Sequence, residues 1–362
     1  MKVLLLVYLF ISTSTFGAGV TSHRFMSKKA LDYMRDAEIR DMLRRNFSTY
    51  LGATMLPDMG YFVRKFYGEN RGWWGEEIHW TPFLNWLWTY NNNKCKSKGW
   101  PPRGSSECEQ LWTIYFGVLS HSIGDIQWHG GYIFRFSVME AGAPVGSGFF
   151  NDAHSIADNM GDLPAVHFYG ERGLGGSINY DLVAKMLNDF ASFRRQPGIP
   201  KNDLILTHGL QEAWYAGVKI GWPAYYYFKL KYKWGHDNYY GTLGGIDNTA
   251  RRIAELTDMI SWENKRLGLS KITTLSNGGD WPFDWFRITR ADWSQTAEKS
   301  YHVPNYQLDP RGTYNCRWGL YLVGARLFSY GQISRCPYKA TSDYQKAQCE
   351  RFRYWPTTCK SY

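Results

Sequence analysis

The clearest periodic pattern in the chain is a helical stripe of apolar residues that leads into the segment HSIGDIQWH. The stripe follows the three- and four-residue steps of one α-helix face, at Leu111, Ile114, Tyr115, Val118 and Leu119. The same steps reach His121 and Asp125, and four further residues reach His129. Carboxylate and imidazole groups on the core-facing side of a helix are costly unless they are paired or bind a metal ion. The pattern therefore predicts either a satisfied His–Asp pair in a helical core or a metal site.

A second His–Asp pair with helical spacing follows at His154 and Asp158. The spacing alone is weak, because His167 and His208 are each followed four residues later by a glutamate. The first site differs from these pairs by its third polar member, His129. Neutral imidazole and carboxylate are a common ligand set for zinc, and the chain has no CxxC thiolate pair to compete with them.

Most of the chain up to about residue 268 carries helical patterns. One helix is expected over the apolar positions between Ala30 and Leu43, and further helices over 181–193, 206–228 and 244–268. Strand-like alternation with hairpin turns is scarce in this part, which predicts an all-α domain. Residues 269–362 are polar, aromatic and cysteine-bearing without a clear period, and we interpret them as a C-terminal extension. The pattern leaves open whether this extension is a domain or a strap over the first one.

The first 17 residues have the features of a secretory signal peptide. Lys2 provides the positive charge at its start, residues 3–11 are apolar, and Thr15 and Gly17 are the small residues of a cleavage site. Cleavage after Gly17 makes Ala18 the first residue of the mature chain. No later apolar run is long enough to span a bilayer, and the last residues carry no hydrophobic tail. We therefore expect an exported protein, secreted or in the lumen of the secretory or endolysosomal pathway.

Charge and cysteine content add to this expectation. The formal charge of +10 falls to +9 without Lys2, and it favours lipid headgroups, nucleic acid or polyanionic glycans as partners, with solubility alone as the alternative. The six cysteines suggest disulfides. Cys95 and Cys108 flank a polar loop and are expected to close it. The other four are expected to pair among themselves; they are Cys316, Cys336, Cys349 and Cys359.

Two residues upstream of the central stripe carry candidate ligand groups. Asp58 lies between Pro57 and Gly60, so we predict a loop carboxylate held in a defined place, with a turn-stabilising aspartate as the alternative. His79 stands at the head of an apolar run in which Pro82 can occupy a first helical turn. The aromatic residues Trp73, Trp74 and Trp128 can form an apolar wall or a lipid-facing rim, or they can pack in the core.

Six segments of this chain, in this order, resemble the zinc-dependent phospholipase C/D family, and most closely its glycosylphosphatidylinositol-specific phospholipase D branch. The match covers roughly residues 18–268, and no P-loop, dinucleotide motif or serine nucleophile competes with it. The segments are SHRFMSKKAL, LGATMLPDMGYF, EEIHWTPFLNW, LSHSIGDIQWHG, FNDAHSIADNMGD and, more weakly, GGIDNTARRIAELT.

The resemblance implies an all-helical fold that binds about three zinc ions in one cleft. One ion is implied at Asp58, His79, His121 and Asp125. Asp125 would bridge to a second ion, held by His23 and by the amino and carbonyl groups of Ala18. The third is implied at His129, His154 and Asp158. Metal-bound hydroxide would attack phosphorus, with Asp58 as a general base as well as a ligand.

The implied substrate is a phospholipid or glycosylphosphatidylinositol, reached by transient contact with a membrane surface. The chain lacks the β-propeller repeats of the mammalian-type enzymes, and the C-terminal extension is outside the family pattern. Three alternatives stay open: an exported single-strand zinc nuclease, a non-catalytic zinc-stabilised lipid- or glycan-binding protein, and a helical secreted protein with incidental His–Asp pairs. The sequence does not distinguish C-type from D-type cleavage, and it does not define the headgroup or the oligomeric state.

Overall fold

The computed structural model describes residues 19–79, 81–103, 106–133, 136, 148–241 and 244–267, together with three strand segments at 313–315, 320–323 and 326–329. The predicted signal peptide, Ala18 and the cysteines beyond residue 268 lie outside the described residues. From residue 20 to residue 267 the described chain is helical. The all-α expectation for this part is confirmed.

The first half of the helical region leads up to the central helix α8. Its elements are α2 (Val20–Tyr33), α3 (Ala37–Arg45), α4 (Phe47–Ala53), α5 (Leu56–Tyr67), α6 (Glu69–Glu77), α7 (Thr81–Cys95), α8 (Ser106–Gln127) and the π-helical turn η1 (Trp128–Ile133). The second half consists of α10 (Gly148–His167), α11 (Tyr180–Arg194), α12 (Lys201–Ile220), α13 (Trp222–Lys231), α14 (Lys233–Asn238) and α15 (Ile246–Leu267).

The strands form a small antiparallel sheet in the order β1 (Thr313–Asn315), β2 (Leu320–Val323) and β3 (Arg326–Ser329). Tyr321 in β2 is opposite Tyr314 in β1 and Phe328 in β3. The sheet lies within the cysteine-bearing region, and β3 lies against α8 and η1.

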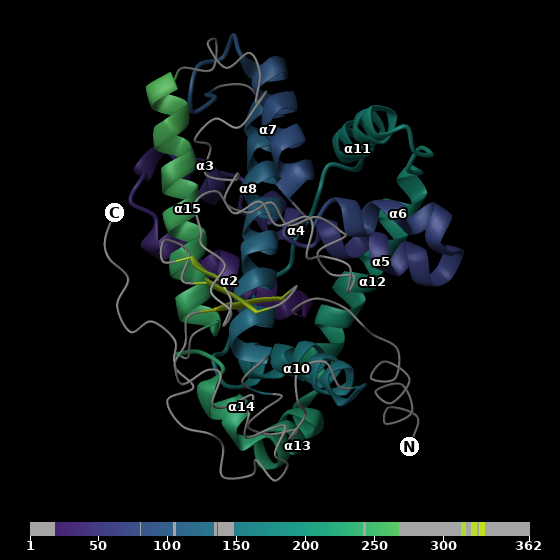
Figure 1. Cartoon of the computed structure of the whole chain (residues 1–362), viewed down its shortest axis with the longest axis vertical. Coiled ribbons are helices and arrows are strands. Elements are labelled where there is room, and N and C mark those ends of the chain that lie inside the picture. The colour runs from purple at the N-terminus through teal and green to yellow at the C-terminus, as the bar shows by residue number, and fades with distance from the viewer. Residues whose placement is uncertain are drawn as a thin grey trace.

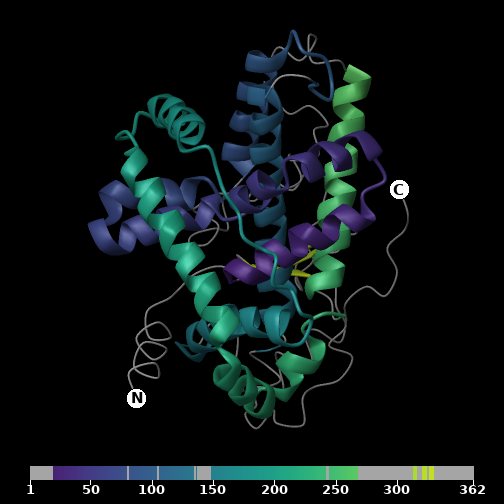
Figure 2. The ribbon, with the colours of Figure 1, turned by 180° about the vertical axis from the view of Figure 1, so that it is seen from behind.

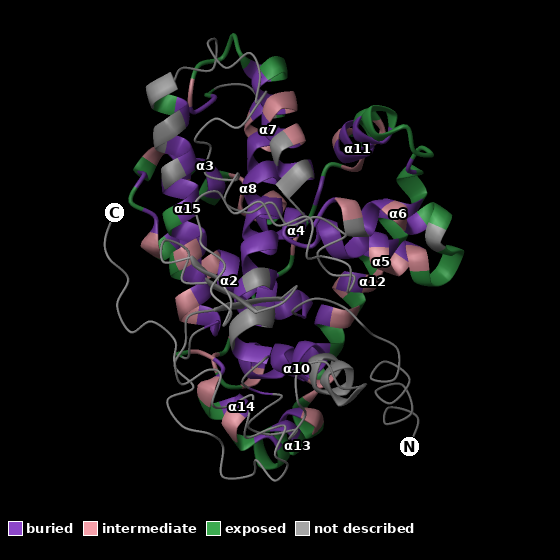
Figure 3. Ribbon diagram, in the orientation of Figure 1, coloured by how far each residue is buried: buried purple, intermediate pink, exposed green. Residues whose placement is uncertain are grey.

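Helix α8 runs through the middle of the helical body, and α2, α4, α7 and α15 pack around it (Figures 1 and 2). Glu107 and Glu109 lie in its first turn, where negative charge is favourable at the helix N-terminus. All side chains from residue 111 to residue 125 are buried, so α8 is the central core helix (Figure 3). Its polar side chains must therefore find partners inside the protein.

The helix expected between Ala30 and Leu43 is interrupted after Tyr33. Asp36 caps α3 by accepting hydrogen bonds from the backbone N–H groups of Glu38 and Ile39, at 3.1 and 3.4 Å. Asp258 on α15 accepts from the backbone N–H groups of Arg35 and Asp36, at 2.9 Å each. A carboxylate more than 200 residues away in sequence thus supports the break. Apolar side chains on both sides of the interruption are buried, Leu31 on α2 and Ile39, Met42 and Leu43 on α3.

A second expected helix, over 206–228, also divides. Helix α12 ends at Ile220, and α13 begins at Trp222 with Pro223 in its first turn, where a missing N–H is harmless. Asp58 likewise lies in the first turn of α5, close behind Pro57, so the loop predicted there is wrong. Gly60 continues this helix, and its lack of a side chain allows α6 to cross closely, because a Cβ at Gly60 would lie 2.1 Å from the Gly75 Cα.

The disulfide predicted between Cys95 and Cys108 is confirmed. It joins the end of α7 to the start of α8 across 13 positions of sequence. Closing a loop of this length contributes about 3 kcal/mol by the chain-entropy model. None of the helices in the described part of the chain combines the length and the apolar character that a membrane span requires.

Candidate metal centre

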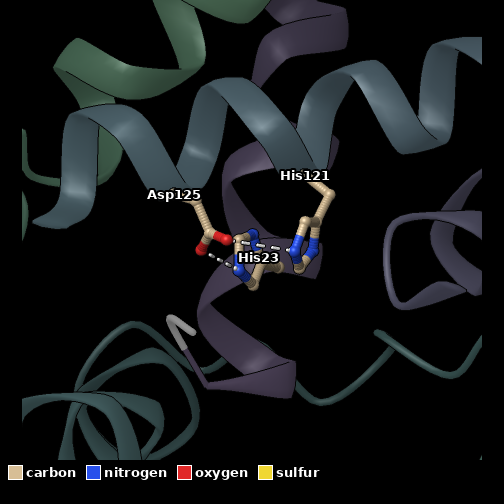
Figure 4. Close-up of side chains that lie close together, drawn as sticks. All are labelled: His23, His121 and Asp125. Atoms are coloured by element: carbon tan, nitrogen blue, oxygen red, sulfur yellow. Dashed lines mark ion pairs between the residues drawn. The ribbon is translucent and has the colours of Figure 1, made fainter. Parts of the chain in front are cut away.

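Asp125 is the central carboxylate of a buried group of ionisable side chains. It lies one turn after His121 on α8, and its Oδ2 is 3.2 Å from His121 Nε2. Its other oxygen, Oδ1, is 3.1 Å from Nε2 of His23, which comes from α2 (Figure 4). The three residues are between 0% and 4% exposed. Two helices that are about 100 residues apart in sequence thus bring two imidazoles to opposite oxygens of one carboxylate.

A second group shares His121 and adds residues from α5 and from the turn before α7. His79 Nε2 is 3.3 Å from Asp58 Oδ1 and 3.7 Å from Asp125 Oδ2. His121 Nε2 is 3.9 Å from the same Asp58 oxygen. The ligand atoms of Asp58, His79 and His121 lie within 4.8 Å of one another, as do those of His23, His121 and Asp125. Five of the sequence-predicted ligands are therefore next to one another: His23, Asp58, His79, His121 and Asp125.

The chemistry of these donors fits a zinc ion. Imidazole nitrogens and carboxylate oxygens are ordinary zinc ligands. Among the described residues, the ring nitrogens of His23 and His121 have no well-aligned hydrogen-bond partner. Buried polar atoms of this kind cost free energy unless something satisfies them, and a cation between the rings and the carboxylates would do so. No other part of the described chain has such a concentration of inward-facing imidazoles.

The backbone holds His79 in a ligand-like orientation. Its Nδ1 bonds to the carbonyl oxygen of Gly75, which leaves Nε2 directed at Asp58. Ligating histidines commonly donate their second ring N–H to a carbonyl in this way. Ser122 on α8 donates a hydrogen bond of 2.9 Å to the His79 carbonyl, and Tyr61 packs against the ring at 4.7 Å. The histidine is thereby fixed to both α6 and α8.

The two remaining imidazoles are stacked. The ring centroids of His23 and His121 are 4.0 Å apart, with 21° between the ring planes. Burial and the neighbouring His23 lower the pKa of His121. Burial also opposes the charge on His23, but its contact with Asp125 and the charges of Asp125 and Asp58 outweigh burial and raise its pKa. Two stacked rings that both carry a proton would repel each other as like charges. Both rings can, however, bind metal ions as neutral ligands.

The third predicted set is only partly described. Helix α8 ends at Gln127, and His129 follows in the π-helical turn η1, so the strict one-turn spacing applies to His121 and Asp125 alone. His154 lies in α10, which packs against η1. The side chains of both histidines lie outside the described residues. Asp158 on α10 is buried, and its Oδ1 accepts a hydrogen bond of 3.1 Å from Trp128 Nε1.

Sequence reasoning missed Asp162, which lies one helical turn after Asp158. Its Oδ1 accepts a hydrogen bond of 2.8 Å from the backbone N–H of Ser22, and its Oδ2 accepts one of 2.9 Å from Trp214 Nε1. Helix α2 has no side-chain cap of its own, so Asp162 supplies the carboxylate at its N-terminus. Burial raises the pKa of Asp162, and these hydrogen bonds oppose the rise. The four-residue step from Asp158 was the signal that could have identified it.

The other histidine pairs lie elsewhere. His208 contacts Glu212 at 3.5 Å and Tyr180 at 2.6 Å, whereas His167 bonds the Val218 carbonyl at 2.8 Å. Neither belongs to the buried group. Of the tryptophans considered for a lipid-facing rim, Trp74 and Trp128 are fully buried in the core, and Trp73 packs against Phe190.

Comparison with known proteins connects this geometry to a family. Residues 22–194 match the family model for zinc dependent phospholipase C. Similar curated proteins are named phosphatidylinositol-glycan-specific phospholipase D. The Dictyostelium discoideum protein is 26% identical over 227 residues, which is 62% of this chain and 23% of that protein. The Mus musculus protein is 30% identical over 170 residues, covering 45% of this chain and 18% of that protein.

The chain thus aligns with less than a quarter of the length of these relatives. No solved structure gives a significant match. The residues that match the family include every member of the buried group. They also include the positions of His129, His154 and Asp158. Over residues 22–194, just under half of its length, this chain is thus similar to the zinc dependent phospholipase C family.

Proposed function

We propose that this protein is an exported zinc-dependent hydrolase that cleaves a phosphodiester bond in phospholipid or glycosylphosphatidylinositol. The observation that carries the proposal is the position of Asp125, between His23 on one side and His121 and His79 on the other. One carboxylate with imidazoles at both oxygens is suited to bridge two metal ions. The names of the relatives support the substrate class.

The ligand assignment extends this geometry to about three ions. One ion is assigned to Asp58, His79, His121 and Asp125, and the second to Asp125, His23 and the amino and carbonyl groups of Ala18. The third is assigned to His129, His154 and Asp158. Gly19 directly precedes α2, and its carbonyl accepts a hydrogen bond of 3.1 Å from the His23 backbone N–H. A mature chain that begins at Ala18 would start one residue before Gly19 and five residues before His23.

The side chains of the buried group would hold the zinc, and Asp58 has a further task. When bound, zinc supplies Lewis acidity to the phosphoryl oxygens and lowers the pKa of water. Asp58 would accept the proton from the attacking water, since its Oδ1 lies 3.3 Å from His79 Nε2 and 3.9 Å from His121 Nε2 within one of the two ligand groups. The Gly75 carbonyl keeps His79 in one tautomer. The burial of the group keeps these charges in a medium of low dielectric constant, where they act strongly.

Metal analysis and product analysis on the purified mature protein test this proposal together. We expect close to three zinc ions per chain, and turnover of phospholipid that a chelator abolishes and zinc restores. Mass spectrometry of the products from a mixed lipid extract identifies the bond that is cut, since C-type cleavage yields diacylglycerol and D-type cleavage yields phosphatidic acid. Substoichiometric zinc, removable without loss of turnover, would contradict the assignment.

The second candidate is an exported nuclease that cuts single strands with the same metal ligands. The net positive charge of the mature chain favours it, because nucleic acid is a polyanion. The comparisons favour the lipase, since the similar curated proteins carry the phospholipase name. Turnover of single-stranded DNA without turnover of any lipid would establish the nuclease.

A further inference from the structure

Helix α13 presents an apolar and basic face to solvent, remote from the metal ligands in sequence. Five large apolar side chains and four lysines are exposed on it and at its two ends. We call this set the α13 surface; it comprises Ile220, Trp222, Tyr226, Tyr227 and Leu230 with Lys219, Lys229, Lys231 and Lys233. Exposed apolar residues are ordinary when scattered, but a contiguous group of this size marks an interaction site.

The helix is apolar on both of its sides. Tyr225 and Phe228 face inward and are 6% and 0% exposed, which is enough to hold α13 on the body of the protein. On the opposite side Trp222, Tyr226 and Leu230 follow one another at four-residue steps, with exposures of 45%, 48% and 78%. A helix that only needed to cover the core would carry polar residues on this outer strip. The outer strip therefore indicates a second apolar environment.

Side chains of the outer strip and its neighbours contact one another. The rings of Trp222 and Tyr226 stack with centroids 3.9 Å apart and 18° between their planes. Beside them, the Tyr227 hydroxyl accepts a hydrogen bond of 2.6 Å from Lys231 Nζ. Aromatic rings with one polar edge suit the boundary between water and lipid, where the ring is buried and the hydroxyl or N–H remains hydrated.

The charge of the α13 surface has one sign. Residues 219–233 contain four lysines and no aspartate or glutamate. Lys233 is paired with Asp237 at 2.5 Å, which leaves Lys219, Lys229 and Lys231 without an acidic partner among the contacts that the structure shows. Lysine side chains place their aliphatic stems along apolar surface and keep the ammonium group in water. Basic residues next to an aromatic strip therefore match an anionic interface.

We propose that the α13 surface docks the protein on a membrane that contains anionic phospholipid. Its apolar strip would enter the headgroup region while the lysines contact lipid phosphates. Single-stranded nucleic acid would also bind to stacked rings and lysines. Its binding does not require exposed aliphatic side chains, and the two most exposed ones here are Ile220 at 74% and Leu230 at 78%. Their exposure favours a lipid surface.

Docking at this place would bring the metal centre near its substrate. Helix α13 packs against α10, which carries Asp158 and Asp162 (Figure 1). The inner side of α13 reaches the end of α10 through Tyr225, whose ring lies 5.5 Å from that of His167. In its use for catalysis the inference rests on the proposed function, since a hydrolase of membrane lipids must hold itself at the interface. The binding itself can be measured without any turnover.

Co-sedimentation with phosphatidylcholine vesicles, with and without phosphatidylserine, tests the inference on the full mature protein. We expect binding that requires phosphatidylserine and weakens with added salt. A Trp222→Ser, Leu230→Ser double variant should bind at least about tenfold more weakly, because it removes two apolar anchors. A Lys229→Gln, Lys231→Gln variant should lose about fivefold for each charge removed. The control is Phe193→Ser, which removes a side chain that is 65% exposed on α11.

Zinc content and turnover of a short-chain, soluble phospholipid should be unchanged in all of these variants. The vesicle result is therefore independent of the proposed function, which only the zinc and turnover measurements test. Vesicle binding that is equal in the wild type and both α13 variants would overturn the docking site. Loss of binding to a single-stranded oligonucleotide, with vesicle binding unaffected, would replace the lipid surface by nucleic acid and would equally overturn the inference.

Discussion

The substitution Asp125→Asn gives the sharpest test of the buried ligand group. Asp125 has one imidazole nitrogen 3.1 Å from Oδ1 and two others 3.2 and 3.7 Å from Oδ2. Asparagine keeps the volume of the side chain in a position that is only 4% exposed, so the packing of α8 should survive. It removes the negative charge and leaves one oxygen in place of two. The substitution therefore separates the role of Asp125 as a ligand from its role in the core.

The expected loss follows from the two oxygens. An asparagine carboxamide can serve one metal ion through its oxygen, while its NH₂ group faces the other as a donor, which repels a cation. At least one ion should then be lost from the proposed three. Removing one electrostatic contact in a dry active site lowers turnover by about 10² to 10³-fold. Even a change outside the direct ligands weakens metal binding by about 10 to 100-fold. Turnover should therefore fall by at least about 10³-fold.

The assay measures zinc per chain and phospholipid turnover in the same preparations, with thermal unfolding as a check on folding. His208→Gln is the matched control, because His208 shares the four-residue spacing to an acidic residue. It is buried beside Tyr180, so losing that 2.6 Å contact should cost about 1 kcal/mol of stability and leave zinc and turnover unchanged. Equal loss of activity in both variants, or full zinc and full turnover in Asp125→Asn, would refute the assignment of Asp125 as the shared ligand.

Two further predictions concern the position of His23. In Gly124→Ala the added Cβ would lie 2.8 Å from His23 Nδ1, so zinc content and turnover should fall, whereas Gly209→Ala, in open space on α12, should only stabilise its helix by about 0.5–1 kcal/mol; unchanged zinc in Gly124→Ala would argue against His23 as a ligand. A chain with one extra residue ahead of Ala18 should remain folded and bind near two zinc ions with strongly reduced turnover, as read by native mass spectrometry. Three ions and full activity in that chain would exclude the N-terminal amino group as a ligand.

Local sequence patterns were enough to predict the helical fold class. Apolar side chains repeat along α8 at the spacing of the helix itself, and this spacing depends on backbone geometry alone. The disulfide between Cys95 and Cys108 was also predictable, because its two cysteines bracket a short polar loop. The adjacency of His121 and Asp125 follows from the same helical step, as their 3.2 Å contact shows. These features involve residues that are near one another in the chain.

The ends of helices were less predictable. The helix expected across Ala30 and Leu43 is broken where Asp258, from α15, binds two backbone N–H groups of the turn. Asp58 was expected in a loop because proline and glycine surround it. It lies in a helix because Pro57 suits a first turn and Gly60 permits the close approach of α6. The first case depends on a segment that is distant in sequence, whereas the second depends on the local preference of proline and on the neighbouring helix.

The candidate site required the tertiary structure. Resemblance to a family assigned Asp58 and His79 to one ion and His23 to a second ion that shares Asp125, but no local period relates α2, α5 and α8. Packing brings His23 onto His121 and places Asp162, from α10, at the start of the helix that carries His23. The exposed strip of α13 could not be predicted from the sequence either, because α13 is apolar on both sides. Only its packing against α10 shows which side is covered. Sequence spacing determines the direction of a side chain on its own helix, whereas the neighbours it meets depend on how the helices pack.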